Sequence, residues 1–117
     1  MRLTALKPFV PSGKDFELAK AFFTDLGFVV NWEGGGYAEL QFGSAAFILQ
    51  HIENQALQEN FMVFVEVDDL GAWWEHVRAS GVLERYAGVR AKEPTDYPWG
   101  NREVHLIDVG GVCWHFG

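Results

Sequence analysis

The 117-residue sequence predicts an α+β domain built from two similar β-α-β-β-β modules. An apolar stripe with helical spacing ends at a glycine in each half of the chain, at Gly27 and at Gly81. Later in each half, two strand-like runs are joined by a glycine turn, at Gly43 and at Gly111. A chain of this length is typical of one domain. The expected boundaries are residues 1–51 for the first module, 52–60 for a connector and 61–117 for the second module.

In the first module, Leu3 to Val10 is strand-like and Pro11 stops it. Ser12 and Asp15 then have the spacing of a capping box, in which a hydroxyl and a carboxylate bind the free amides of a first helical turn. The helical stripe that follows consists of Phe16, Ala19, Phe22, Phe23 and Leu26, with Gly27 as its stop. Three strands are expected after the helix: Phe28 to Trp32, Tyr37 to Phe42, and Ala46 to His51.

The second module repeats this order. Phe61 to Val67 is the most strand-like run of the chain, and Asp68-Asp69 is expected to cap a helix with a stripe of Leu70, Trp73, Trp74 and Val77. A further strand is expected between Val82 and Ala91, and a final hairpin from Arg102 to Asp108 and from Val112 to Phe116.

The glycine spacings differ between the modules. The two helix-stop glycines are 54 positions apart and the two turn glycines are 68 apart, so the second module has 14 extra residues. We place them in the stretch that contains Tyr97-Pro98-Trp99-Gly100. A long insert in a small domain is typical of a functional loop.

Composition limits the classes of partner. Nine basic and sixteen acidic residues give a formal net charge of −7, which disfavours nucleic acids and anionic membranes and favours cationic small molecules. Cys113 is the single cysteine, so no intrachain disulfide forms, as is usual in a reducing cytosol. No apolar run approaches the ~18 residues of a membrane span, and no signal-peptide pattern is present. We therefore expect a cytoplasmic protein.

Three stretches, in order, resemble the vicinal oxygen chelate (glyoxalase/bleomycin resistance/dioxygenase) superfamily. They are Phe16 through Phe28, Val65-Glu66-Val67-Asp68-Asp69-Leu70, and Pro98-Trp99-Gly100 with Arg102-Glu103. Within that superfamily the whole chain is most similar to the bleomycin-resistance drug-binding proteins. The resemblance implies two modules whose curved mixed sheets form a cup, with the helices on the outer face. It also implies a homodimer with ligand clefts at its interface and exchanged N-terminal strands, for which Pro11-Ser12-Gly13 would be a short hinge.

The last turn departs from the family pattern. The family usually has Asp-Pro-x-Gly-Asn there, whereas this chain has Asp108-Val109-Gly110-Gly111-Val112. Glycine still supplies the positive φ that a hairpin turn needs. Any ligand contact made by the family's asparagine is missing.

Metalloenzymes of the superfamily carry His or Glu on the first and fourth strands of each module, where a metal acts as a Lewis acid. The resemblance maps these positions to Ala5, Leu49, Met62 and His115, and of these only His115 can bind a metal. Since a working site needs about three protein ligands, we expect no metal or other cofactor at these positions and no catalytic residues. One enzymatic alternative stays open: a lyase or hydrolase-like enzyme with a displaced site, because strand alternation puts Glu103 and His105 on one face with His115.

The leading hypothesis is non-catalytic sequestration of an aromatic, cationic small molecule. The resemblance implies that aromatic side chains clamp the flat rings of the drug. Strand alternation places further residues at the floor of the cup and charged side chains beside it, and these are added to the expected binding residues. A cation between aromatic faces gains ~0.5–2 kcal/mol. The expected ligand-binding residues are Trp32, Tyr37, Phe47, Leu49, Phe64, Glu66, Trp99, Glu103, His105 and His115.

Other readings of these side chains remain. Ordinary packing is the alternative for Trp32, Tyr37 and Phe64, and we interpret Glu39 as a solvated surface carboxylate. Trp73, Trp74 and Trp114 are expected in the core or an interface. A third hypothesis is an interaction module with no small ligand.

Overall fold

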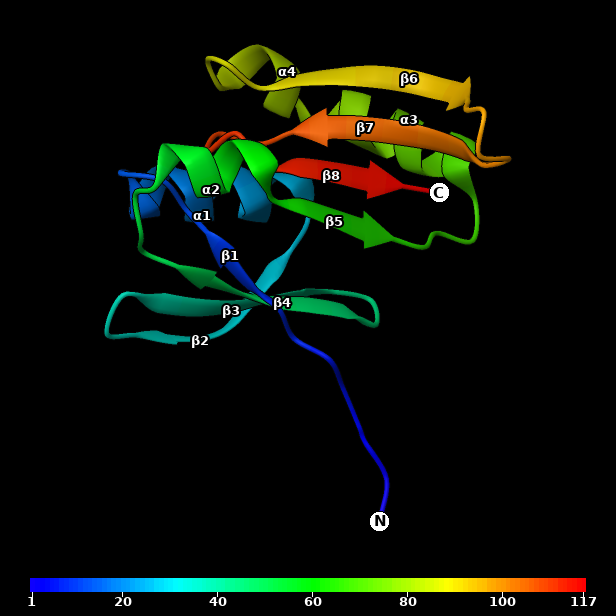
Figure 1. The fold of residues 1–117 in the computed structure, drawn as a ribbon. Helices are drawn as coiled ribbons and strands as arrows, with labels where there is room; N and C mark the ends of the chain where they lie inside the picture. Colours follow the sequence, from blue (N-terminus) through cyan, green and yellow to red (C-terminus); the bar gives the residue numbers. More distant parts are fainter.

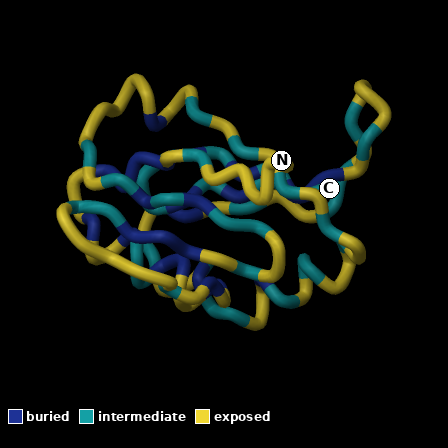
Figure 2. Tube along the Cα trace, turned by 90° about the horizontal axis from the view of Figure 1, so that it is seen from below, coloured by how far each residue is buried: buried dark blue, intermediate teal, exposed yellow.

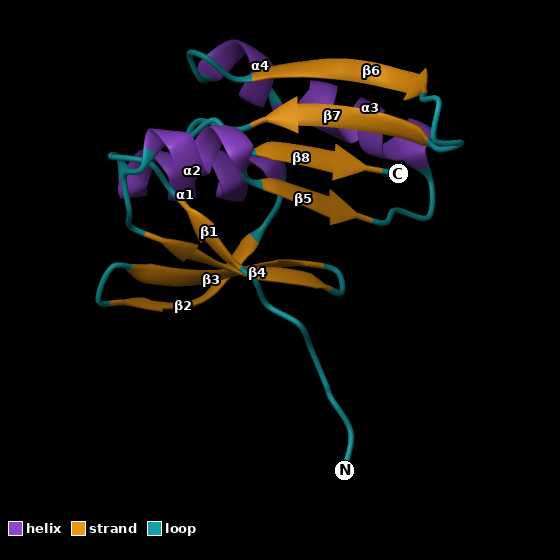
Figure 3. Ribbon diagram, viewed as in Figure 1, coloured by secondary structure: helices purple, strands orange, loops and turns teal.

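The computed structural model describes residues 1–117 and contains two four-stranded sheets, one from each module, with helices packed against one face of each (Figures 1 and 3). This confirms the predicted α+β class. The first module comprises β1 (Phe9–Pro11), α1 (Phe16–Leu26), β2 (Val29–Gly34), β3 (Tyr37–Phe42) and β4 (Ala45–Gln50). Its sheet order is β1-β4-β3-β2, in which β1 runs parallel to β4 and the other pairs are antiparallel.

The second module has the same sheet order, β5-β8-β7-β6, again with one parallel pair, β5 with β8. Its elements are β5 (Met62–Val65), α3 (Leu70–Ser80), α4 (Val82–Arg85), β6 (Arg90–Asp96), β7 (Arg102–Ile107) and β8 (Cys113–Phe116). A short helix, α2 (Gln55–Asn60), lies in the connector between the modules. None of the helices has the length and apolarity needed to cross a membrane.

Both long helices begin at a capping carboxylate and end at a glycine. Asp15 accepts a hydrogen bond from the Leu18 amide at 3.0 Å, and Asp69 caps α3 in the same way. Ser12 was expected to share the cap of α1, but its hydroxyl donates to the carbonyl of Gly13, so that part of the prediction is wrong. Gly27 has φ +121° and its amide donates to the last turn of α1, as a helix stop should.

The first predicted strand is much shorter than expected. Only Phe9–Pro11 pairs with β4, and residues 1–6 extend away from the body of the molecule (Figure 1). Leu3 and Leu6 in this arm are 98% and 89% exposed.

The second correction concerns the strand expected between Val82 and Ala91. The chain there forms α4, and β6 begins only at Arg90. Half of the 14 extra residues of the second module therefore lie between Gly81 and Arg90. The loop of residues 97–101 accounts for a smaller part.

One core joins the two modules. The ring centroid of Phe23 in α1 lies 4.9 Å from that of Phe47 in β4 and 5.3 Å from that of Trp114 in β8. The helix-facing sides of both sheets thus meet in a single cluster of buried residues. Buried and less buried residues are interspersed along the chain, and the loops are mostly exposed (Figure 2). Trp114 is 2% exposed, as its predicted helix-facing position requires.

Asp108 organises the turn that departs from the family pattern. Its side chain is 3% exposed, and its Oδ1 accepts hydrogen bonds from the amides of Gly110 and Val112 at 2.8 and 3.0 Å. Its Oδ2 accepts from the Trp114 indole at 2.9 Å. The carboxylate thereby fixes the β7–β8 hairpin without the family's proline or asparagine.

Candidate ligand-binding site

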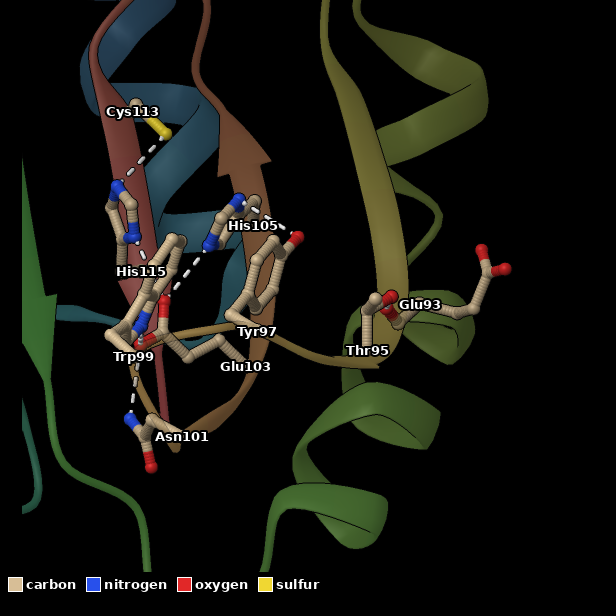
Figure 4. A network of polar contacts seen from close by, with 9 residues as sticks. All are labelled: Glu93, Thr95, Tyr97, Trp99, Asn101, Glu103, His105, Cys113 and His115. Carbon is tan, nitrogen blue, oxygen red and sulfur yellow. Dashed lines mark hydrogen bonds and ion pairs between the residues drawn. The ribbon is translucent and has the colours of Figure 1, made fainter.

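Glu103 on β7 is the centre of a polar network on the open face of the second sheet (Figure 4). Its side chain is buried, and it accepts four hydrogen bonds. Oε2 accepts from the Trp99 indole at 2.9 Å and from Asn101 at 3.0 Å. Oε1 lies 2.9 Å from Nε2 of His105 and 3.0 Å from Nδ1 of His115. The network therefore joins the β6–β7 loop to β7 and β8.

The carboxyl group of Glu103 is held in its charged form. Burial raises its pKa, but the hydrogen bonds from Trp99, His105, His115 and Asn101 outweigh that effect and lower the pKa to about 2. The open face of this sheet therefore carries a fixed negative charge at neutral pH.

Strand register brings the two histidines together. His105 on β7 is directly opposite His115 on β8, and their ring centroids are 4.1 Å apart. Val104 and Leu106 point into the core, so alternation along β7 directs Glu103 and His105 to the open face. The predicted side-chain alternation of β7 is thus confirmed.

An aromatic stack borders this network. The Tyr97 ring lies between the ring of Trp99 and the ring of His105, at 4.6 Å from each and nearly parallel to both. Trp99 is thus fixed at its N–H edge by Glu103 and on one side by Tyr97, yet the residue is 62% exposed. An exposed, immobilised ring of this kind offers a stacking surface at low entropic cost.

The first module contains a similar group around Glu39. Its carboxylate accepts hydrogen bonds from the Trp32 indole at 3.2 Å, from Asn31 at 2.7 Å and from Lys7 at 2.9 Å. The hydrogen bonds from Asn31 and Lys7 lower the pKa of Glu39 despite its burial. The interpretation of Glu39 as a solvated carboxylate is wrong, because it is only 7% exposed.

Sequence reasoning missed the asparagines of both groups and Lys7. The available signal was the recurrence of a Trp, an Asn and a Glu close together in each module: Trp32, Asn31 and Glu39, then Trp99, Asn101 and Glu103.

The other expected ligand-binding residues are spread over several places. Phe64 on β5 is 54% exposed and pairs in register with His115, so it borders the network. Glu66 is exposed just beyond β5, and with Phe64 it lines a cavity of about 500 Å³ between β4 and β5. Tyr37 lies on the other sheet, where its ring packs edge-on against Phe9.

Two residues expected in the cup floor are in the core. Leu49 is completely buried and faces the helices, so it cannot line an open face. Phe47 is 2% exposed, packs against Phe23 and Trp114, and only borders the cavity between β4 and β5. The open-face positions of β4 are those of Ala46 and Ile48, because the side chains alternate.

The metal-ligand positions implied by the family resemblance do not fit a metal ion. Ala5 is in the exposed arm, Leu49 is in the core, and Met62 is an exposed thioether on β5. Only His115 offers a strong ligand atom. These four positions therefore do not form a metal site.

Comparisons with known proteins agree on one family. The family model described as Glyoxalase/Bleomycin resistance protein/Dioxygenase superfamily matches residues 7–116. A bleomycin resistance protein from Klebsiella pneumoniae is 28% identical over 107 residues, which are 90% of this chain and 84% of that protein.

Two solved structures illustrate the likeness of the fold. The crystal structure of a bleomycin-binding protein complexed with bleomycin has a TM-score of 0.84 at 25% identity, covering 97% of both chains. A bleomycin-binding protein from Streptomyces verticillus, complexed with copper(II)-bleomycin, has a TM-score of 0.80 at 20% identity and covers 99% of this chain and 96% of its own.

Proposed function

Because the chain belongs to the Glyoxalase/Bleomycin resistance protein/Dioxygenase superfamily, we propose that it binds and sequesters an aromatic, cationic small molecule of the bleomycin type without chemical conversion. The observation that carries this proposal is the recurrence of one device in both modules. In each module, a buried glutamate holds the N–H edge of an exposed tryptophan, Trp32 (47% exposed) on Glu39 and Trp99 (62% exposed) on Glu103.

The fixed indole rings supply the contact surface for flat ligands. A mobile tryptophan loses side-chain freedom when a ligand stacks on it, and that loss lowers the affinity. Trp99 has already lost this freedom because Glu103 and Tyr97 hold it. Stacking of a flat heteroaromatic ring on Trp99 would therefore cost little entropy.

Charge supports a cationic ligand. The two glutamates have lowered pKa values and lie beside the exposed rings, and the whole chain has a formal net charge of −7. A cation that contacts both a ring face and a carboxylate gains from each.

A homodimer would complete the clefts. The open sheet faces expose large apolar side chains, among them Val29 at 63%, Met62 at 67% and Phe64 at 54%. Such surfaces are usually covered by a partner or a ligand. In the proposed assembly, Leu3 and Leu6 of the N-terminal arm pack on the second copy as exchanged strands, in the cytoplasm, where Cys113 stays reduced.

Calorimetric titration with bleomycin tests the binding. We expect saturable binding and a higher melting temperature, since a ligand at a hundred times its Kd stabilises the fold by ~2.7 kcal/mol. Trp99→Ala and Trp32→Ala should each weaken the affinity by about tenfold or more, as expected for loss of ~1.4 kcal/mol. Trp74→Phe, a change on α3, is the matched control and should leave the affinity unchanged. The absence of both heat and a melting shift would refute sequestration of this ligand.

Light scattering after size exclusion tests the assembly independently. The full chain should elute as a dimer, and removal of residues 1–6 should shift it toward the monomer. A monomeric full chain at micromolar concentration would refute the dimer.

A further inference from the structure

The Glu103 network contains three potential metal ligands in one small volume. One ligand atom each from Glu103, His105 and His115 lie within 4.8 Å of one another. In the hydrogen-bonded network, Oε1 of Glu103 lies 2.9 Å from Nε2 of His105 and 3.0 Å from Nδ1 of His115. Two imidazoles and one carboxylate form a donor set that zinc and other divalent first-row ions prefer.

We propose that Glu103, His105 and His115 form a binding site for a divalent transition-metal ion, with Zn²⁺ as the preferred occupant. The site differs from the metal positions of the superfamily, because two of its ligands come from β7 and all three belong to one module. It goes beyond the proposed sequestration and does not depend on it.

The backbone preorganises the three ligands. Glu103 and His105 are two residues apart on β7 and share a face, and His115 is the direct cross-strand neighbour of His105. Each donor thus projects from a paired strand and not from a mobile loop. Only small side-chain rotations would be needed to replace the two hydrogen bonds at Oε1 by bonds to one ion.

Each ligand also has an outer partner that fixes its orientation. The second ring nitrogen of His105 lies 3.2 Å from the Tyr97 hydroxyl, and that of His115 lies 3.5 Å from the Cys113 sulfur. Trp99 and Asn101 hold Oε2 of the glutamate, which leaves Oε1 for the ion. Partners of this kind orient metal-ligating imidazoles and carboxylates in known sites.

The proton count of such a site balances without an added base. In the neutral rings, the protons between the imidazoles and Oε1 move to the outer nitrogens, where Tyr97 Oη and Cys113 Sγ become acceptors. The ion then has three protein ligands, and a catalytic-type zinc site of this kind takes water or a bound molecule as its fourth ligand. Figure 4 shows the rings of His105 and His115 directed at the carboxylate of Glu103.

Titration of chelator-treated protein with Zn²⁺ at neutral pH tests the site. We expect one tight equivalent per chain by calorimetry. Titration with Co²⁺ should give the visible absorption of a four- or five-coordinate ion, and Zn²⁺ should displace it. X-ray absorption of the zinc protein should show two imidazoles in the ligand shell.

Variants identify the ligands. His105→Gln and His115→Gln should each weaken Zn²⁺ binding by at least a hundredfold, and Tyr97→Phe by about tenfold through loss of an outer partner. His51→Gln, at an exposed histidine next to β4, is the matched control and should bind normally. Circular dichroism in chelator checks that each variant folds. If a histidine variant does not fold, the Tyr97→Phe titration and the imidazole count of the wild-type zinc protein decide.

Two results would overturn the proposal. One is the absence of Zn²⁺ binding by the wild-type protein when the metal is in large excess over the chain. The other concerns the two histidines outside the site, His51 and His76, the latter on α3 beside the Leu26 carbonyl. Zn²⁺ binding that His51→Gln or His76→Gln abolishes, while His105→Gln and His115→Gln leave it intact, would refute the site.

Discussion

Replacement of Asp108 by asparagine should remove a distinct pH dependence of stability. Burial raises the pKa of Asp108 from 3.8 to about 6, although hydrogen bonds from the Trp114 indole and from turn amides favour the carboxylate. In the unfolded chain the same group titrates near its ordinary value. The difference of about two units corresponds to roughly 3 kcal/mol, since one unit is about 1.4 kcal/mol.

The sign of this effect follows from proton counting. Between about pH 4 and pH 6 the folded protein holds a proton on Asp108 that the unfolded chain has released. The contribution of Asp108 to the free energy of unfolding is therefore largest below pH 4. It falls as the pH rises through this window and is constant above it. Most paired carboxylates, including Glu103 with its lowered pKa, give the opposite slope.

Urea denaturation of the wild-type protein and of Asp108→Asn at pH 4, 5, 6 and 7 isolates the contribution. Asparagine does not titrate, so the stability of the wild type relative to the variant should fall by about 2.4 kcal/mol from pH 4 to pH 7, the remainder being lost below pH 4. A carbon-13 titration of the Asp108 carboxyl should give a midpoint near 6. A stability difference that is the same at all four pH values would refute the reasoning, as would a midpoint near 3.8.

Three further substitutions test the fold, each by urea denaturation at pH 7. Phe23→Ala removes the ring that links both modules and should cost about 3–5 kcal/mol, whereas Leu18→Ala on the exposed side of the same helix should cost under 1 kcal/mol. Gly27→Ala should cost at least about 1–2 kcal/mol, because its φ is +121° and a Cβ would come within 2.6 Å of the Phe42 ring. Asp69→Ala removes the cap of α3 and should cost about 1 kcal/mol.

Two controls belong to these experiments. Gly88→Ala also places alanine at a positive φ, but no atom lies within 4 Å of the added Cβ, so its cost measures backbone strain alone. Asp68→Ala removes the neighbouring exposed carboxylate and should have little effect. Equal losses for Gly27→Ala and Gly88→Ala would contradict the predicted clash, and equal losses at the two aspartates would contradict the predicted cap.

Local signals predicted most of the fold. The spacing of Phe16 through Leu26 together with Gly27 predicted α1, because a helix needs both an apolar stripe and a residue tolerant of positive φ at its end. The strand expected between Val82 and Ala91 exists but lies later, at Arg90–Asp96, so its predicted position was wrong. Val82 and Leu83 are apolar, but a four-residue helix needs no long periodic pattern, so nothing in this segment distinguished the two states.

The side-chain directions on β4 show why the site was predicted only in part. Ala46 and Ile48 are apolar like Phe47 and Leu49, so alternation did not reveal which pair faces the helices. On β7 the polar Glu103 and His105 alternate with Val104 and Leu106, and the direction was predicted correctly. Lys7, one partner of Glu39, lies 32 positions before it, and sequence spacing does not indicate such a contact.

The contact of Phe23 with Phe47 and Trp114 makes the folding of each module depend on the other. Neither module has a complete hydrophobic core of its own, because aromatic rings of one module fill the core of the other. A fragment ending at the connector would expose these rings to water and should precipitate or stay unfolded when made alone. Mixing both fragments should restore a folded complex, and heating the intact chain should give one calorimetric peak.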